Sequence, residues 1–311
     1  MRLEQSGKPS FHARRLDRTV TLTCADGTPI VGTWFLGDTP KATVVINSGT
    51  GIPRRFYARF AAWLAERGFA VLTYDYRGIG HSKPRGSLRG FQASMTSWAE
   101  QDMTAAIAWT KARHPELPLY VVGHSIGGQL LGLAHNTELV DGVISIASST
   151  GSWKSLSGSL RWLSAALWYG LVPATTGALG YAPTKQLGWG EDLPAGVARE
   201  WATWCKSPDY FLPYLSGAQI ARVASFKKPW LSLAFTDDPI ANETTVAALL
   251  RMYASLTPTT RWFSPEQVGA REIGHLGFFT HARRDLWHNV SDQLDAWLAS
   301  APRESAYALS A

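Results

Sequence analysis

The chain has 311 residues, of which 45% are hydrophobic and 17% are charged, an ordinary balance for a globular protein. This length favours one large domain with an insertion over two full domains, and the composition excludes bulk disorder. The net charge is +6 and the pI about 9.4, and part of the positive excess lies near the N-terminus. We therefore expect a solvated basic arm at 1–19 and no nucleic-acid partner.

Cys24 and Cys205 are the only cysteines, so we expect buried, reduced thiols. The N-terminus lacks the apolar stretch of a secretory signal, which favours a cytoplasmic protein. Residues 162–184 carry no charge, but Pro173 and several glycines interrupt them. We therefore predict a buried or interfacial helix over 160–172 that ends at Pro173, with no membrane span and at most weak contact with an interface.

The first half of the chain alternates between short apolar runs and stretches of helical spacing. A hairpin is predicted first, from two runs that flank Ala-Asp-Gly, and parallel βαβ units follow it. Parallel strands buried on both faces have continuous apolar sequences, as these do. The predicted strands are 20–24, 30–35, 42–47, 69–74, 119–122 and 140–146, and the predicted helices are 56–67, 98–112 and 126–134.

This alternation stops near residue 150 and returns near 223. We expect a strand at 229–235, a helix at 243–254, a strand at 261–264 and a helix at 285–298. The prediction is an α/β fold with a mostly parallel sheet and helices on both faces. Its core comprises 20–150 and 223–300, a mainly helical cap is inserted at 151–222, and 301–311 form a tail.

The sequence Gly-His-Ser-Ile-Gly at 123–127 matches the G-x-S-x-G pattern of a nucleophile elbow. A strand is predicted directly before it and a helix of small residues directly after it, which is the context that this pattern requires. Ser125 is therefore the candidate nucleophile. Gly-His-Ser also occurs at 80–82, but Lys-Pro follows it, so we expect Ser82 to be a loop residue bonded to its local backbone.

A serine hydroxyl is a weak nucleophile and needs a base, which in turn needs a carboxylate to orient it. His275 lies between two glycines after the last predicted strand and is the candidate base. Two adjacent carboxylates, Asp237 and Asp238, follow the strand at 229–235, where parallel sheets place functional groups. We favour Asp238. The other aspartate would then cap the next helix or face solvent.

The developing oxyanion needs backbone N–H donors. We assign one to Ile126, after the nucleophile, and the other to Thr50, in the glycine-containing loop that follows the strand at 42–47. This loop lacks the Lys-Ser/Thr ending of a P-loop, and no G-x-G-x-x-G is present. The histidines and cysteines are scattered without the spacing of a metal site, so we expect neither a metal nor another cofactor.

On these motifs the chain resembles the α/β-hydrolase superfamily. Residues 74–82 (YDYRGIGHS) look like its D-x-R-G-x-G-x-S segment, and 123–127 look like its elbow. The chain is most similar to bacterial predicted α/β hydrolases labelled serine aminopeptidase or hydrolase-4. One departure is the oxyanion loop, where Ser48-Gly49 replaces the common His-Gly and removes any hydrogen bond that this histidine would supply.

The resemblance implies hydrolysis of an ester, thioester or amide of a small-molecule substrate through an acyl-enzyme. An acyltransferase with the same triad and a non-catalytic binding protein on this fold are the alternatives. Six of the fourteen tryptophans lie within 151–222, so we expect the cap to line an apolar pocket for a small to medium substrate. The candidates for substrate contact are Trp162, Trp168 and Tyr169.

Overall fold

The computed structural model describes residues 16–300. The predicted tail at 301–311 and most of the predicted basic arm lie outside the described residues. Residues 16–19 of that arm are instead part of the first strand, β1 (Leu16–Thr23), which pairs antiparallel with β2 (Pro29–Leu36). The pairing runs the whole length of both strands, and it confirms the predicted hairpin.

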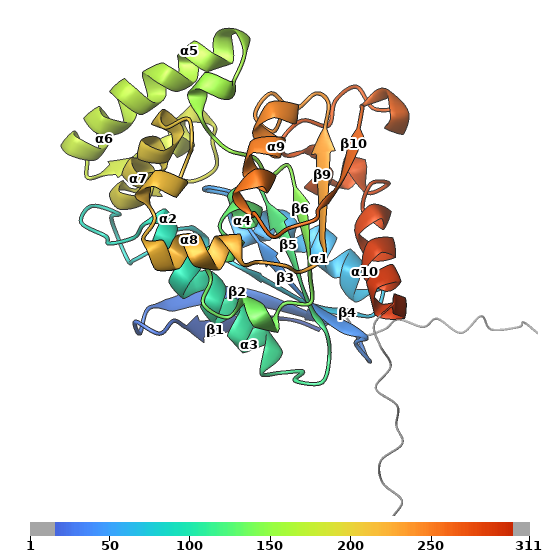
Figure 1. Cartoon of the computed structure of the whole chain (residues 1–311). Coiled ribbons are helices and arrows are strands. Elements are labelled where there is room, and N and C mark those ends of the chain that lie inside the picture. Colours follow the sequence, from blue (N-terminus) through green and yellow to red (C-terminus); the bar gives the residue numbers. More distant parts are fainter. Residues whose placement is uncertain (1–15, 301–311) are drawn as a thin grey trace, which may run out of the picture.

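One sheet of eight strands forms the centre of the molecule (Figure 1), in the order β1-β2-β4-β3-β5-β6-β9-β10. β2 is antiparallel to both of its neighbours, and every other pairing is parallel. The five inner strands β4, β3, β5, β6 and β9 are buried along their whole length, which explains their continuous apolar sequences. Their bounds are β3 (Ala42–Asn47), β4 (Phe69–Tyr74), β5 (Leu119–His124), β6 (Gly142–Ile146), β9 (Trp230–Phe235) and β10 (Thr259–Phe263).

Helices cover both faces of the sheet, as predicted, and each face has its own apolar core. Along β3, Val45 packs into one core and Val44 and Ile46 into the other, as the two-residue period of a strand requires. α1 (Ala58–Ala65) and α10 (His288–Ser300) pack on the face of Val44, and α2 (Met95–Ser97), α3 (Thr104–Lys111) and α8 (Gly217–Ala224) contribute to the opposite one. α9 (Glu243–Met252) contributes to both cores.

The helix predicted over 126–134 is shorter than expected. α4 (Ile126–Gln129) gives way to a 3₁₀ turn at Leu131–Leu133, and Ala134 is extended. Glycines at 127, 128 and 132 explain the early end, because glycine is among the poorest helix formers. α4 nevertheless provides the helical turn that the elbow needs after Ser125.

Three helices of the predicted cap lie together beyond the sheet, at the upper left of Figure 1. They are α5 (Gly158–Ala166), α6 (Val172–Ala178) and α7 (Ala195–Lys206). A two-stranded sheet of β7 (Tyr181–Ala182) and β8 (Leu193–Pro194) joins α6 to α7, and no sequence pattern indicated it. None of the described helices is long and apolar enough to cross a membrane.

The prediction that a helix ends at Pro173 was wrong. A π-helical turn at Leu167–Leu171 connects α5 to α6, which begins at Val172 and continues to Ala178. Proline disrupts a helix because it lacks an N–H and because its ring crowds the preceding turn. Here Pro173 follows the π-helical turn and occupies the first turn of α6, where a missing N–H costs little. The helical path therefore continues past the proline.

Candidate active site

Ser125 lies at the sharp turn between β5 and α4, with φ 51° and ψ −118°. Residues other than glycine rarely adopt a positive φ, so the surrounding structure must hold this turn. A Cβ on Gly123 would lie 2.5 Å from the Gly128 nitrogen, and one on Gly127 would lie 2.3 Å from the Asn47 oxygen. Glycine at both positions therefore lets the strand and the helix approach closely enough to form the elbow.

Ser125, His275 and Asp238 form one hydrogen-bonded row. Ser125 Oγ lies 3.0 Å from His275 Nε2, and His275 Nδ1 lies 2.7 Å from Asp238 Oδ2. Asp238 Oδ1 accepts the backbone N–H groups of Ile240 and Ala241. Burial raises the pKa of Asp238, but the hydrogen bond from His275 and these two amides outweigh it and hold that pKa below its usual value. The ionised carboxylate favours a proton on Nδ1, which leaves Nε2 free to accept one from Ser125.

Asp237 neither caps the next helix nor simply faces solvent, the two roles expected for it. Its Oδ2 accepts the backbone N–H groups of Ile273 (2.7 Å) and Gly274 (3.0 Å), directly before His275. Asn242, not Asp237, is the N-cap of α9. Asp237 is half-buried and fixes the start of the loop that carries His275, whereas Asp238 contacts the imidazole itself.

The second Gly-His-Ser lies away from this row. Ser82 Oγ donates to the Asp75 carbonyl oxygen and accepts the Val31 N–H, both at 2.8 Å. Ser82 is buried, and these two contacts join β2 to the turn after β4. As predicted, the hydroxyl of Ser82 is occupied by backbone groups.

His124, which precedes the nucleophile, is buried and does not bond Ser125. Its Nε2 lies 2.9 Å from the His275 carbonyl oxygen, so it supports the loop of the candidate base. Burial, together with the nearby His275, lowers the pKa of His124 to about 3. Its ring is therefore neutral at physiological pH, and one of its nitrogens can accept a hydrogen bond.

Tyr57 is a residue that the sequence did not indicate. Its buried hydroxyl accepts the backbone N–H of Gly49 at 2.8 Å, which holds the start of the oxyanion loop. Ser48, at the position of the missing histidine, turns its hydroxyl toward the Tyr74 carbonyl oxygen. Tyr57 belongs to the 3₁₀ turn at Arg54–Tyr57, six residues after the oxyanion loop ends at Gly51, and is part of no motif.

The two backbone N–H groups assigned to the oxyanion are not engaged in hydrogen bonds within the described residues. Among the described residues no acceptor is recorded for the N–H of Thr50 or of Ile126. Thr50 lies at the wall of the main cavity, and Ile126 follows Ser125 at the first position of α4. Both N–H groups are therefore available to a bound oxygen atom.

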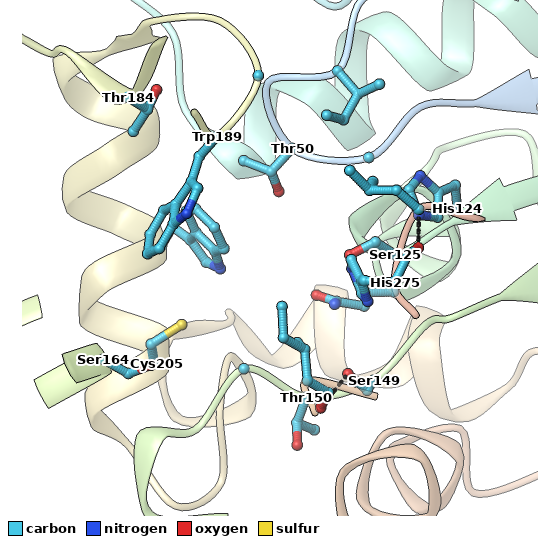
Figure 2. Close-up of a pocket in the computed structure, with 18 of the residues that line it drawn as sticks. Thr50, His124, Ser125, Ser149, Thr150, Ser164, Thr184, Trp189, Cys205 and His275 are labelled. Atoms are coloured by element: carbon cyan, nitrogen blue, oxygen red, sulfur yellow. Dashed lines mark hydrogen bonds between the residues drawn. The ribbon is translucent and has the colours of Figure 1, made fainter. Parts of the chain in front are cut away.

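A cavity of about 250 Å³ opens at Ser125 and His275. Figure 2 shows Thr50 and Trp189 on one side of it, Ser149 and Thr150 on the other, and Cys205 far from the serine. None of the described residues that line it carries a carboxylate, an ammonium or a guanidinium group. Its apolar wall consists mainly of Ile52, Leu156, Leu160, Trp168, Trp189, Leu193, Trp201, Ile240 and Leu276.

Of the three aromatic residues predicted to contact substrate, only Trp168 lines this cavity. Trp162 and Tyr169 do not; their side chains are 67% and 58% exposed on the outside of the cap. The spacing explains the difference. Trp162 and Tyr169 are seven residues apart and share one helix face, whereas Leu160 and Trp168, at multiples of four residues, share another. This second face is the one turned toward the cavity.

Glu191 connects the predicted cap to the core beside the oxyanion loop. Its backbone N–H donates to the Gly51 carbonyl oxygen at 2.8 Å. Its side chain accepts the Gly80 N–H and pairs with Arg55 and Lys83. Although partial burial raises the pKa of Glu191, Lys83, Gly80 and Arg55 bring it below its usual value. These contacts hold Trp189 at the cavity wall.

A family model described as "Serine aminopeptidase, S33" (Hydrolase_4) matches residues 38–189, a range that includes the elbow and the oxyanion loop. The eight-stranded sheet and the elbow are those of the α/β-hydrolase fold. The chain has this fold, and over the matched residues it resembles the α/β-hydrolase superfamily. An esterase of Pyrococcus furiosus has the same fold, with a TM-score of 0.58 and 16% identity over 96% of this chain and 97% of the other.

Two curated relatives of this α/β hydrolase match shorter stretches. A putative monoglyceride lipase of Schizosaccharomyces pombe is 37% identical over 93 residues, 30% of this chain and 24% of the relative. The monoglyceride lipase of Rattus norvegicus is 28% identical over 102 residues, 32% of each chain. The chain thus covers about a quarter to a third of the length of these relatives.

Proposed function

We propose that this α/β hydrolase is a serine hydrolase that cleaves an ester of a small to medium, largely apolar substrate. The observation that carries the proposal is the hydrogen-bonded row of Ser125, His275 and Asp238 at the wall of an apolar cavity. A nucleophile, a base and an orienting carboxylate in this arrangement are what acyl transfer through a covalent intermediate requires. The match to a hydrolase family model and to monoglyceride lipases supports ester hydrolysis.

In this mechanism Ser125 Oγ attacks the ester carbonyl carbon while His275 Nε2 takes the hydroxyl proton. Asp238 stabilises the imidazolium that results. The carbonyl oxygen becomes an oxyanion, which accepts hydrogen bonds from the N–H groups of Thr50 and Ile126. His275 then gives its proton to the departing alkoxide, so an alcohol leaves and an acyl-Ser125 remains. Water then attacks the acyl carbon while His275 takes a proton from it. His275 returns this proton to Ser125 Oγ as the carboxylic acid leaves.

We also propose that residues 151–222 act as a cap that selects the substrate. Leu160, Trp168 and Trp201 give it an apolar wall over the reactive serine. A charged substrate group would lose its hydration here without meeting a charged partner, which costs several kcal/mol. We therefore expect neutral, mostly apolar esters to be preferred over charged ones and over large polar polymers.

The test is hydrolysis of p-nitrophenyl esters from acetate to palmitate by the wild type and by Ser125→Ala. The wild type should show turnover that depends on chain length, and Ser125→Ala should lose several powers of ten in rate. The same reactions with added hexanol separate hydrolysis from acyl transfer, because a transferase forms mainly the hexyl ester. Equal rates in the two proteins would overturn the proposal. If the hexyl ester were the main product, the activity would be acyl transfer and not hydrolysis.

A further inference from the structure

Gln129 places a polar side chain at the wall of the apolar cavity, one helical turn after the candidate nucleophile. Its backbone N–H donates to the Ser125 carbonyl oxygen (3.3 Å), and its own carbonyl oxygen accepts the Tyr253 hydroxyl (2.7 Å). The residue is only 5% exposed. Its backbone is thus fixed in relation to Ser125, and its side chain reaches a space that is mostly apolar.

The orientation of the Gln129 amide is set by Tyr210, whose hydroxyl donates to Gln129 Oε1 at 2.8 Å. A phenol hydroxyl has a single proton, and here that proton points at the amide oxygen. The amide oxygen is therefore occupied, and the two N–H groups on Nε2 are the ones left over.

Nε2 has no recorded hydrogen-bond partner within residues 16–300. Three hydroxyls at the wall, those of Ser149, Thr150 and Thr184, donate to backbone carbonyl oxygens, whereas the buried indole N–H of Trp168 also lacks a partner among the described residues. Nε2 is not among the fully enclosed polar atoms, so it keeps accessible surface where Gln129 lines the cavity. Gln129 thus differs from these residues, because its donor is directed at whatever occupies the cavity.

We propose that Gln129 Nε2 is a substrate-binding donor and that the preferred esters carry an uncharged oxygen acceptor in the part that fills the cavity. An ether, carbonyl or hydroxyl oxygen would accept this hydrogen bond. A carboxylate or phosphate is excluded, because none of the described residues lining the cavity carries an ammonium or guanidinium group. The proposal rests on the proposed ester hydrolysis and adds a polar requirement to an otherwise apolar specificity.

The strained backbone of Tyr210 supports a specific role for this arrangement. Its φ is +51°, which is uncommon for a residue with a bulky side chain. Its ring is fully buried against Trp204 and Phe211, and its hydroxyl reaches Gln129 across the boundary between the predicted cap and the core. Backbone strain of this kind is most often found where the structure holds a functional group in place.

The experiment compares Gln129→Met with the wild type on matched pairs of esters. Within a pair the two esters have the same length, but one has an ether oxygen in place of a methylene. One series varies the oxygen along the acyl chain of p-nitrophenyl esters, and a second varies it along the alcohol of acetate esters. The quantity measured is the ratio of kcat/KM for the oxygenated ester to that for its hydrocarbon partner. Leu160→Met is the control, because it keeps the side-chain size at the cavity wall and removes no donor.

In at least one pair the ratio should fall about tenfold in Gln129→Met and stay unchanged in Leu160→Met, since losing one such hydrogen bond is worth about 1.4 kcal/mol. Gln129→Glu, which keeps Oε1 but has no N–H, should act in the same direction and serves if Gln129→Met does not fold. Unchanged ratios in every pair, in variants that still hydrolyse the hydrocarbon esters, would overturn the inference alone. Absence of hydrolysis by the wild type would instead overturn the proposed function, and the inference with it.

Discussion

The hydroxyl of Tyr57 lies 2.7 Å from Nδ1 of His124, and this contact fixes where the protons of both residues lie. The His275 carbonyl oxygen can only accept, so the neutral imidazole of His124 carries its proton on Nε2 and donates it there. Nδ1 is then an acceptor, and the Tyr57 hydroxyl, which itself accepts the Gly49 N–H, donates to it. One chain of hydrogen bonds therefore connects the oxyanion loop to the loop of the candidate base.

Tyr57→Phe should break this chain at its centre. The Gly49 N–H and His124 Nδ1 would both lose a buried hydrogen-bond partner. The oxyanion loop and the loop of His275 would then no longer be connected by hydrogen bonds. We expect kcat to fall about tenfold with a smaller change in KM, because the two loops position the oxyanion donor at Thr50 and the candidate base His275. The control is Tyr120→Phe on β5, whose ring stacks on Trp297 away from the site. Equal losses in both variants would contradict a specific role for Tyr57.

The low pKa of His124 predicts how stability changes with pH. Its pKa is about 3 in the folded protein and about 6.5 in an unfolded chain, so between these values the unfolded state binds a proton that the folded state does not. The free energy of unfolding should therefore fall as pH drops below about 6.5, and this residue should contribute about 2 kcal/mol of that loss by pH 5.

Urea unfolding at pH 7.5 and pH 5.0 measures this contribution, with His124→Gln as the comparison. The variant has no group that titrates at this position, so the difference in unfolding free energy between the two pH values should be smaller than in the wild type. Other groups titrate in both proteins and cancel in the comparison. The same pH dependence in the two proteins would contradict a neutral, buried His124.

The two neighbouring aspartates should differ sharply when each is changed to asparagine. Asp238→Asn keeps the size of the side chain but favours the wrong tautomer of His275, so kcat should fall by about 10⁴-fold. Asp237→Asn keeps an acceptor for the Ile273 and Gly274 N–H groups and should cost far less. Steady-state kinetics on one ester decide the matter, and the reverse ranking of the two variants would transfer the orienting role to Asp237.

The aromatic residues of the predicted cap offer a matched pair. Trp168→Ala should move the acyl-length optimum for p-nitrophenyl esters to longer chains, because it opens the cavity wall where each buried methylene contributes about 0.8 kcal/mol. Trp162→Ala should leave the optimum unchanged, since its ring is exposed outside the cavity. Trp168→Phe is the milder variant if the alanine destabilises the fold. A wild-type profile without an optimum, or the same shift in both alanine variants, would mean that the cap does not select by length.

The sheet was predictable because burial leaves a direct mark on the sequence. β3, β4, β5, β6 and β9 are buried along their whole length and are continuous apolar runs, whereas the helix boundaries depended on less visible features. The π-helical turn before Pro173 and the early end of α4 are examples. Neither follows from the hydrophobic period, and the early end of α4 comes instead from its glycines.

The elements of the candidate site were predictable where the pattern is local, as at Ser125, and less so where contacts are remote. Two adjacent aspartates look alike in sequence, and only the rotation of the loop decides which one reaches His275. Tyr57 and Gln129 lie close to the oxyanion loop and the elbow in sequence but belong to neither motif, and only their side-chain contacts reveal their roles. In the predicted cap, the helical spacing was enough to show that the three aromatic residues could not all face the cavity, because Trp168 cannot share a helix face with both Trp162 and Tyr169.

The central claim is that Ser125 is the nucleophile, and covalent labelling with a fluorophosphonate tests it most directly. The chain offers its own control in Ser82, which has the same preceding residues but a hydroxyl held by backbone groups. Labelling followed by peptide mapping should place the phosphonyl group on Ser125 in the wild type and in Ser82→Ala, and Ser125→Ala should take up none. Undiminished labelling of Ser125→Ala, or a modified peptide that contains Ser82, would contradict the account.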